Sequence, residues 1–151
     1  ALQFEKTIAE NMSRKKEKIN AEKRQQEQMG KIEMFKKVLE IDSVDQVANF
    51  GLGSIYLELG RYEEALPPLQ TLVEKYKNYS SAWLLLGKTL EKLSKIDETI
   101  ETYRMGIAVA SKNGDLMPLK DMQGRLNQLL IPSPEASHTQ ADPRQNLKPL
   151  C

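Results

Sequence analysis

Two stretches of this sequence decide its fold, because they repeat each other at a fixed distance. Residues 49–56 read Asn-Phe-Gly-Leu-Gly-Ser-Ile-Tyr, and residues 83–90, which begin 34 positions later, read Trp-Leu-Leu-Leu-Gly-Lys-Thr-Leu. The same shift pairs further residues around these stretches: Leu59 with Leu93, Glu64 with Glu98, Leu66 with Ile100 and Leu69 with Tyr103. Similarity at a fixed period is the signature of a chain built from stacked structural repeats.

The apolar residues inside each unit recur three, four or seven positions apart, which is the spacing of one face of an α-helix. Each unit therefore predicts two amphipathic helices, separated by turn residues such as Gly60 and Asn78. The expected helices span residues 45–59 and 62–76 in the first unit, and 80–93 and 96–111 in the second. We expect an all-α fold made of antiparallel helix pairs.

The helix–turn–helix period resembles the tetratricopeptide repeat, whose pattern is Trp-x2-Leu-Gly-x2-Tyr, then Ala-x3-Phe, then Pro. The second unit carries this pattern in Trp83, Leu86, Gly87, Leu90 and Tyr103. The first unit carries it in Leu52, Gly53, Tyr56, Ala65 and Leu69. The departures are Asn49 at the Trp position, Thr99 and Gly106 at small-residue positions, and Lys77 and Ser111 at the closing Pro. The resemblance implies a right-handed helical solenoid with full repeats at about 45–78 and 79–112.

Each small or acidic motif residue has a packing or electrostatic reason. Gly53 and Gly87 let a neighbouring helix approach closely, although each costs about 1 kcal/mol in helix propensity. The acidic pairs Glu63-Glu64 and Asp97-Glu98 recur at the start of the second helix of each unit, where they complement the positive helix end. Their recurrence with the repeat favours this structural role over a catalytic pair of carboxylates.

A partial repeat precedes the two full units. Residues 31–44 resemble the second helix of an earlier unit, because Phe35 falls on Leu69 by the same shift. The helix that would come before it, around residues 13–26, lacks the large motif residues. We expect the repeat domain as a whole to span residues 31–130.

A C-terminal capping helix is expected at residues 115–130, as solenoids require to shield their last unit. Asp115 is expected to cap it, with Pro118 in the first turn, where a missing N–H is harmless. Pro67-Pro68 lies inside an expected helix of the first unit and should kink or loosen it.

The two ends of the chain differ from the repeats in composition. Residues 1–30 are expected to form a charged N-terminal arm or helix, in which Phe4, Ile8 and Met12 recur every four residues and suit an anchor on the groove or on another subunit. Residues 131–151 are rich in proline and polar residues, and we expect them to be disordered. This tail holds the only His and the only Cys, His138 and Cys151, neither of which is placed for catalysis.

Composition excludes several classes of function. The chain has 22 Lys+Arg against 21 Asp+Glu, so its net charge of +1 argues against general nucleic-acid binding. With one His and one Cys, no metal site or disulfide framework is expected, and neither is a cofactor. No phosphate loop or nucleophile elbow is present, so we expect no enzymatic activity. No apolar run approaches the roughly 20 residues of a membrane helix, and these features favour a cytoplasmic protein.

The resemblance places partner binding in a concave groove lined by the first helix of each unit. We expect this protein to be an interaction module that binds a peptide or helix of another protein there. The residues expected to face the groove are Phe50, Ser54, Leu57 and Glu58 in the first unit, and Leu84, Lys88, Glu91 and Lys92 in the second. The alternative for the charged members is an ordinary solvated helix face.

Three other functions remain open from the sequence. One is a structural protein that self-assembles into homo-oligomers through its arm or its solenoid ends. Another is an accessory that contacts an acidic protein, a membrane surface or RNA through the basic segment 14–24, whose six basic residues also suit a solvated helix. The third is an accessory or regulatory subunit of a larger complex, or a fragment of a longer protein, since the chain begins at Ala1 without an initiator Met.

Overall fold

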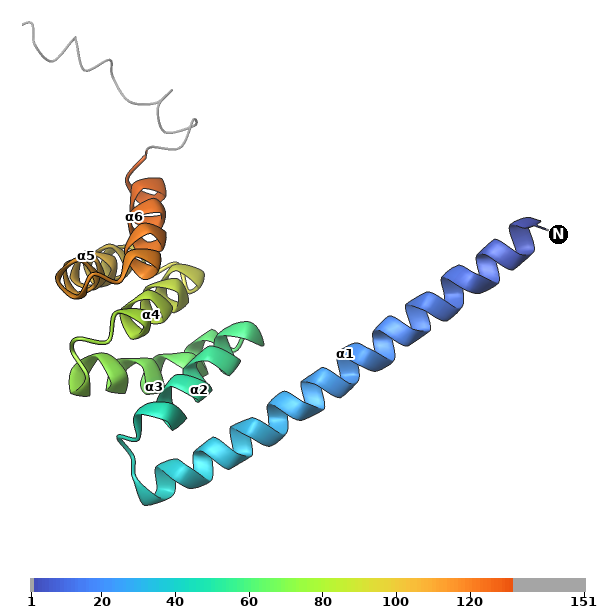
Figure 1. The fold of residues 1–151 in the computed structure, drawn as a ribbon, viewed down its shortest axis with the longest axis horizontal. Coiled ribbons are helices and arrows are strands. Elements are labelled where there is room, and N and C mark those ends of the chain that lie inside the picture. Colours follow the sequence, from blue (N-terminus) through green and yellow to red (C-terminus); the bar gives the residue numbers. More distant parts are fainter. Residues whose placement is uncertain (1, 132–151) are drawn as a thin grey trace, which may run out of the picture. The chain divides into compact units, whose positions relative to one another are not determined.

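The computed structural model describes residues 2–131, and within that range the only regular elements are α-helices, joined by short turns (Figure 1). The helices are α1 (Leu2–Ile41), α2 (Gln46–Glu58), α3 (Tyr62–Lys75), α4 (Ser80–Lys92), α5 (Ile96–Asn113) and α6 (Leu116–Leu130). The five helices expected from residue 45 onward are thereby confirmed, with ends that differ by two residues at most. Most of the tail at 131–151, with His138 and Cys151, lies outside the described residues, so its expected disorder stays a prediction.

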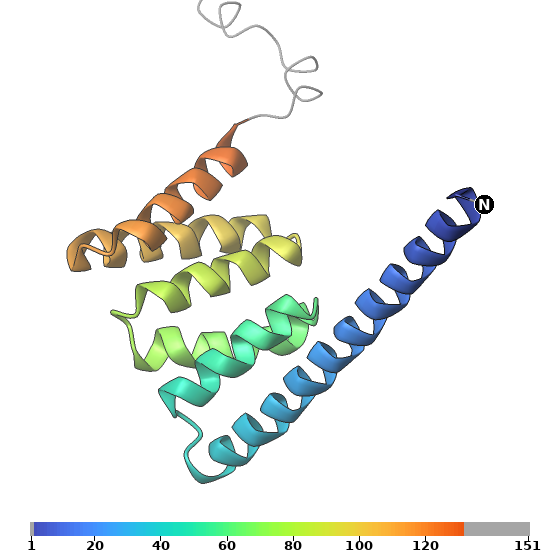
Figure 2. The same ribbon diagram turned by 45° about the vertical axis from the view of Figure 1, so that its right-hand side comes forward.

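The chain divides into two compact units, Ala1–Tyr76 and Lys77–Cys151, each of which is described by itself. From here on, the first and second unit mean these two parts of the chain, which contain the first and the second repeat. In the first unit, α2 packs against both α1 and α3. The expected arm at 1–30 and the expected half-repeat at 31–44 are joined without a break in α1, which extends far beyond the end of α2 (Figure 2). Only its C-terminal part is anchored: Ile32 is buried and Phe35 packs on Gly51 of α2.

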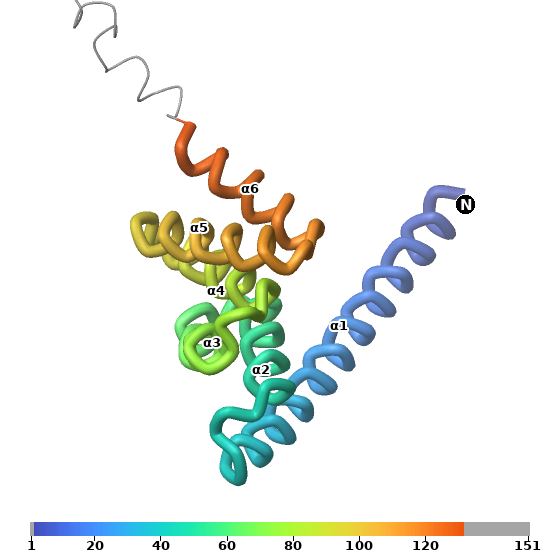
Figure 3. The backbone as a smooth tube through the Cα atoms, turned by 60° about the vertical axis from the view of Figure 1, so that its left-hand side comes forward, coloured from blue at the N-terminus to red at the C-terminus, as the bar shows by residue number. Residues whose placement is uncertain are grey.

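In the second unit, α4 pairs with α5, and α6 packs against both of them (Figure 3). The core of this unit contains Tyr103, Ala110 and Met122, all fully buried. Partly buried apolar side chains surround these three: Trp83, Leu84, Ile107, Leu119, Leu126 and Leu129. The α6 helix thus covers the apolar side of the last pair, as a capping helix must.

The motif glycines hold the two helices of each pair close together. A Cβ on Gly53 would meet the side chain of Leu69, and a Cβ on Gly87 would meet the ring of Tyr103. Leu69 and Tyr103, which the 34-residue shift pairs, are both completely buried. The contact between glycine and large residue is therefore the same in both units.

In the first unit, Asn49 stands at the position of the motif tryptophan and makes the hydrogen bond that Trp83 makes in the second unit. Trp83 Nε1 donates to the carbonyl oxygen of Lys77 at 2.9 Å. Asn49 Nδ2 donates to the carbonyl oxygen of Ser43 at 3.1 Å. Donors and acceptors are each 34 residues apart, so both units tie the start of the first helix to the preceding loop in the same way.

The turns that end α2, α4 and α5 share one backbone geometry. Gly60, Ser94 and Gly114 have φ angles of 75°, 58° and 73°, in the left-handed region. The N–H of the next residue bonds in each case to a carbonyl five residues back, from Arg61 to Tyr56, Lys95 to Leu90 and Asp115 to Ala110. This is the Schellman arrangement for ending a helix, in which glycine carries no Cβ penalty.

Ser94 is the non-glycine member of these three turns, and Ser94→Gly should stabilise the second unit. The left-handed conformation costs about 1–2 kcal/mol for a residue with a Cβ, and the greater chain entropy of glycine offsets about half of that gain. We expect the free energy of unfolding in urea to rise by about 0.5–1 kcal/mol. The reverse change at the matching position, Gly60→Ser, should lower it by a similar amount; a loss on Ser94→Gly would contradict this account.

Two local predictions have different outcomes. The α3 helix continues through Pro67 and Pro68, and the kink or loosening expected there stays a prediction. The prediction that Asp115 caps α6 with its side chain is wrong, although Asp115 does occupy the N-cap position. Its carboxylate instead accepts a hydrogen bond from Ser80 Oγ at 2.6 Å, which joins the starts of α4 and α6.

Candidate partner-binding surface

In the first unit, the expected groove residues lie along α2. Phe50, Ser54 and Leu57 are half-buried, and Glu58 is exposed. Glu58 accepts a hydrogen bond from Gln28 Nε2 of α1 at 2.8 Å. An open hollow of about 410 Å³ lies between these two helices and is lined by Ala21, Arg24, Gln25, Gln28, Glu58 and Leu59. The expected site on α2 therefore has α1 as its immediate neighbour.

In the second unit, the expected residues lie along α4. Leu84, Lys88 and Glu91 are half-buried, and Lys92 is exposed. Leu84 packs beside the core of the unit. Lys88 and Glu91 are not free side chains, because both are bound by α6.

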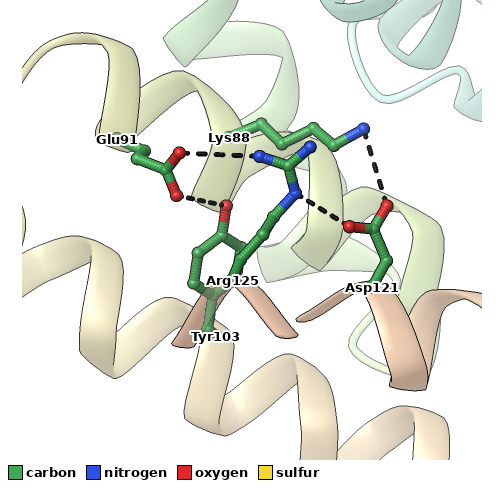
Figure 4. A network of polar contacts seen from close by, with 5 residues as sticks. All are labelled: Lys88, Glu91, Tyr103, Asp121 and Arg125. Atoms are coloured by element: carbon green, nitrogen blue, oxygen red, sulfur yellow. Dashed lines mark hydrogen bonds and ion pairs between the residues drawn. The ribbon is translucent and has the colours of Figure 1, made fainter. Parts of the chain in front are cut away.

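These contacts form an ionic network between α4, α5 and α6 (Figure 4). Lys88 Nζ lies 3.8 Å from Asp121 Oδ2, and Arg125 Nε donates to Asp121 Oδ1 at 2.8 Å. Arg125 Nη1 reaches Glu91 Oε2 at 3.5 Å. The Tyr103 hydroxyl donates to Glu91 Oε1 at 3.2 Å. Two cations and two anions thus alternate across the helices.

The network is partly open to solvent, since the side chains of Lys88, Glu91, Asp121 and Arg125 are 28–38% exposed. Ion pairs with this exposure contribute about 0–1 kcal/mol each to the free energy of unfolding, so their main effect is to hold these four side chains in fixed orientations. Burial raises the pKa of the Tyr103 hydroxyl, and the nearby negative charge of Glu91 raises it further. Tyr103 therefore keeps its proton and remains a donor to Glu91 at neutral pH.

Sequence reasoning missed Asp121 and Arg125, because α6 was expected only to cap the repeats. A signal for a larger role was present in the spacing of Leu119, Met122 and Leu126. These positions are separated by three and four residues, as are Trp83, Leu86 and Leu90 of α4. In this spacing, helix α6 resembles the first helix of a further repeat. Its polar residues Asp121 and Arg125 contact Lys88 and Glu91 of α4. An open hollow of about 360 Å³ adjoins the network and is lined by Lys120, Asp121, Gly124, Arg125 and Gln128.

Two further features concern the chemistry of residues 2–131. Within them, no group of three or more His, Cys, Asp and Glu side chains is arranged to hold a metal ion. None of the helices in this range has the length and apolar character needed to cross a membrane.

Comparison with known proteins agrees with the repeat geometry. The family model described as tetratricopeptide repeat matches residues 32–110. A TPR repeat-containing protein of Pseudomonas aeruginosa is 34% identical over 98 residues, which cover 65% of this chain and 93% of that protein.

Solved structures give the same result. A protein from Bordetella parapertussis is 30% identical with a TM-score of 0.57, and the match covers 65% of this chain and 85% of that protein. The Sgt2 TPR domain from Aspergillus fumigatus has a TM-score of 0.63 at 21% identity, covering 82% of this chain and 79% of that domain, which shows the likeness of fold alone. The expected all-α repeat fold is confirmed, and the chain belongs to the tetratricopeptide-repeat family.

Proposed function

We propose that this chain is an adaptor that binds a peptide or helical segment of another protein on the first helices of its repeats, α2 and α4. Proteins of the family are generally protein–protein interaction modules and are generally not catalysts. The finer proposal concerns which surface is used and what it recognises.

One observation carries the proposal: an apolar side chain and a partly exposed ionic network share the α4–α6 surface. Leu84 is half-buried on α4, where it packs beside the core, and it stands one helical turn before Lys88 on the same side of the helix. Lys88, Glu91, Asp121 and Arg125 offer charged groups that other side chains already hold in place. Such preorganised groups lose little conformational entropy on binding. The mixture suits a segment with both apolar and charged residues, such as an amphipathic helix.

Removing two apolar side chains tests this assignment. Partners captured by the full chain from its native host would be identified by mass spectrometry, and their affinity measured by calorimetry. We expect the double variant Phe50→Ala, Leu84→Ala to weaken binding at least about tenfold, because apolar anchors at the centre of an interface carry most of its energy.

The matched control removes two apolar side chains from α5 instead. Ile96 and Met105 are 42% and 50% exposed, and Ile96→Ala, Met105→Ala should leave the affinity unchanged. Circular dichroism melts would establish that both double variants stay folded. Equal affinity of the Phe50/Leu84 variant and the wild type would rule out the assigned surface.

A further inference from the structure

The N-terminal part of α1 is a long helix that the rest of the chain leaves uncovered. Every residue from Leu2 to Glu27 is exposed, while Ile32 further along the same helix is buried against the first unit. These 26 residues correspond to a helix of about 39 Å, at about 1.5 Å per residue. From here on, the name arm is kept for these residues, 2–27, and no longer for the range 1–30 expected from the sequence. A helix without tertiary contacts gains little stability from its own hydrogen bonds, so a partner that covers one side would stabilise it.

The arm carries one apolar stripe. Phe4, Ile8, Met12 and Ile19 are 71%, 43%, 68% and 55% exposed. At about 100° per residue they share one side of the helix. Ile32 and Phe35, which pack against the first unit, lie on the roughly opposite side. The stripe therefore points away from the surface on which α1 is anchored.

The charged residues that flank the stripe are all basic. Ile8, Met12 and Ile19 fit the a and d positions of a heptad with Met12 and Ile19 at a and Ile8 at d. Lys18 then occupies a g position, and Lys16 and Lys23 occupy e positions. No acidic residue stands at an e or g position between Phe4 and Gln25. These positions set partner choice in a coiled coil, because they oppose the flanks of the other helix.

We propose that the arm binds an acidic amphipathic helix of another protein by coiled-coil pairing. Charge complementarity selects this occupant over a second copy, because a parallel pair of arms would place Lys18 against Lys23. It also selects it over a lipid surface, because a partner helix can place opposite charges facing Glu5, Lys15 and Glu22 at the a and d positions, whereas a layer of acyl chains cannot. RNA is disfavoured because the arm has Phe4 as its only aromatic residue for stacking on bases.

The seam residues of this interface are not among the residues proposed to bind a partner on α2 and α4. The chain would then join two proteins, one on its repeats and one on its arm. The stripe and the flanking lysines carry this inference whether or not the repeats bind as proposed above.

A designed probe tests the proposal with the full chain. The probe is a peptide of the same length as the arm, with leucines facing Ile8, Met12 and Ile19. A glutamate faces Lys15, and lysines face Glu5 and Glu22, so that no charge in the seam is left unpaired. Its e and g positions hold glutamate, which also prevents it from pairing with itself, and a matched peptide holds lysine there instead. Fluorescence anisotropy should show at least about tenfold tighter binding of the glutamate peptide, with affinity falling as salt rises.

Two variants of the chain separate pairing from simple charge attraction. Lys16→Glu, Lys18→Glu, Lys23→Glu should reverse the preference, so that the lysine peptide binds more tightly. Lys6→Glu, Arg14→Glu, Arg24→Glu makes the same change of charge at positions outside the seam and should keep the original preference. Ile8→Ser, Met12→Ser should abolish binding of both peptides without changing the melting of the repeats.

Three outcomes would overturn the proposal. One is equal reversal by both charge variants, which would mean attraction without a seam. Another is concentration-dependent self-association of the wild type that Ile8→Ser, Met12→Ser removes. The last is tighter binding to phosphatidylserine vesicles or to poly-uridine RNA than to the glutamate peptide.

Discussion

Replacement of Tyr103 by alanine should lower the free energy of unfolding by about 3–5 kcal/mol, the range for aromatic residues removed from a packed core. Tyr103 is completely buried, and its ring fills the space above Gly87. Because α4, α5 and α6 all meet at this side chain, no single neighbour can move into the cavity. Urea unfolding monitored by circular dichroism measures the loss.

Tyr103→Phe is the matched control, because it keeps the ring and removes only the hydroxyl that donates to Glu91. We expect it to cost about 1 kcal/mol, since Glu91 is partly exposed and regains water. A phenylalanine variant as unstable as the alanine variant would mean that the network, and not the packing of the ring, stabilises the second unit.

Gly87→Ala should destabilise the protein by about 1–3 kcal/mol, although alanine is the better helix former. An added Cβ would meet ring carbons of Tyr103, and this ring is buried and rigid. The two helices of the second unit would have to separate. The change is measured as the shift in the urea midpoint.

Gly124→Ala in α6 shows what the same substitution does without a neighbour. A Cβ there meets nothing within 4 Å, so the gain in helix propensity should appear in full, as about 0.5–1 kcal/mol of added stability. Equal effects at Gly87 and Gly124 would contradict the close approach of α4 and α5.

The regular part of this fold was predictable from the sequence because its causes are local and repeated. Apolar residues at helical spacing fix each helix, and the fixed period fixes the pairing of Gly53 with Leu69 and of Gly87 with Tyr103. The substitution of Asn49 for tryptophan looked like a departure from the pattern, and it keeps the same hydrogen bond to the preceding loop.

The rest depended on contacts between helices that the sequence does not pair. Asp115 stands where an N-cap is expected, yet Ser80 of a different helix competes for its carboxylate. Arg125 reaches Glu91 and Asp121 only because α6 lies against α4. The break in composition near residue 30 suggested a boundary, but α1 continues across it, since no helix-ending proline or capping turn stands there.

The most direct test of the proposed adaptor function is to map the binding of its captured partner by NMR. The partner segment, chosen as one that still binds the Ile8→Ser, Met12→Ser variant, would be added to the isotope-labelled full chain, and the changes in amide chemical shift followed residue by residue. We predict that the largest changes lie in α2, α4 and α6, around Leu57, Lys88 and Arg125. Changes confined to α3 and α5, or to residues 2–27 of α1, would contradict binding on the first helices of the repeats.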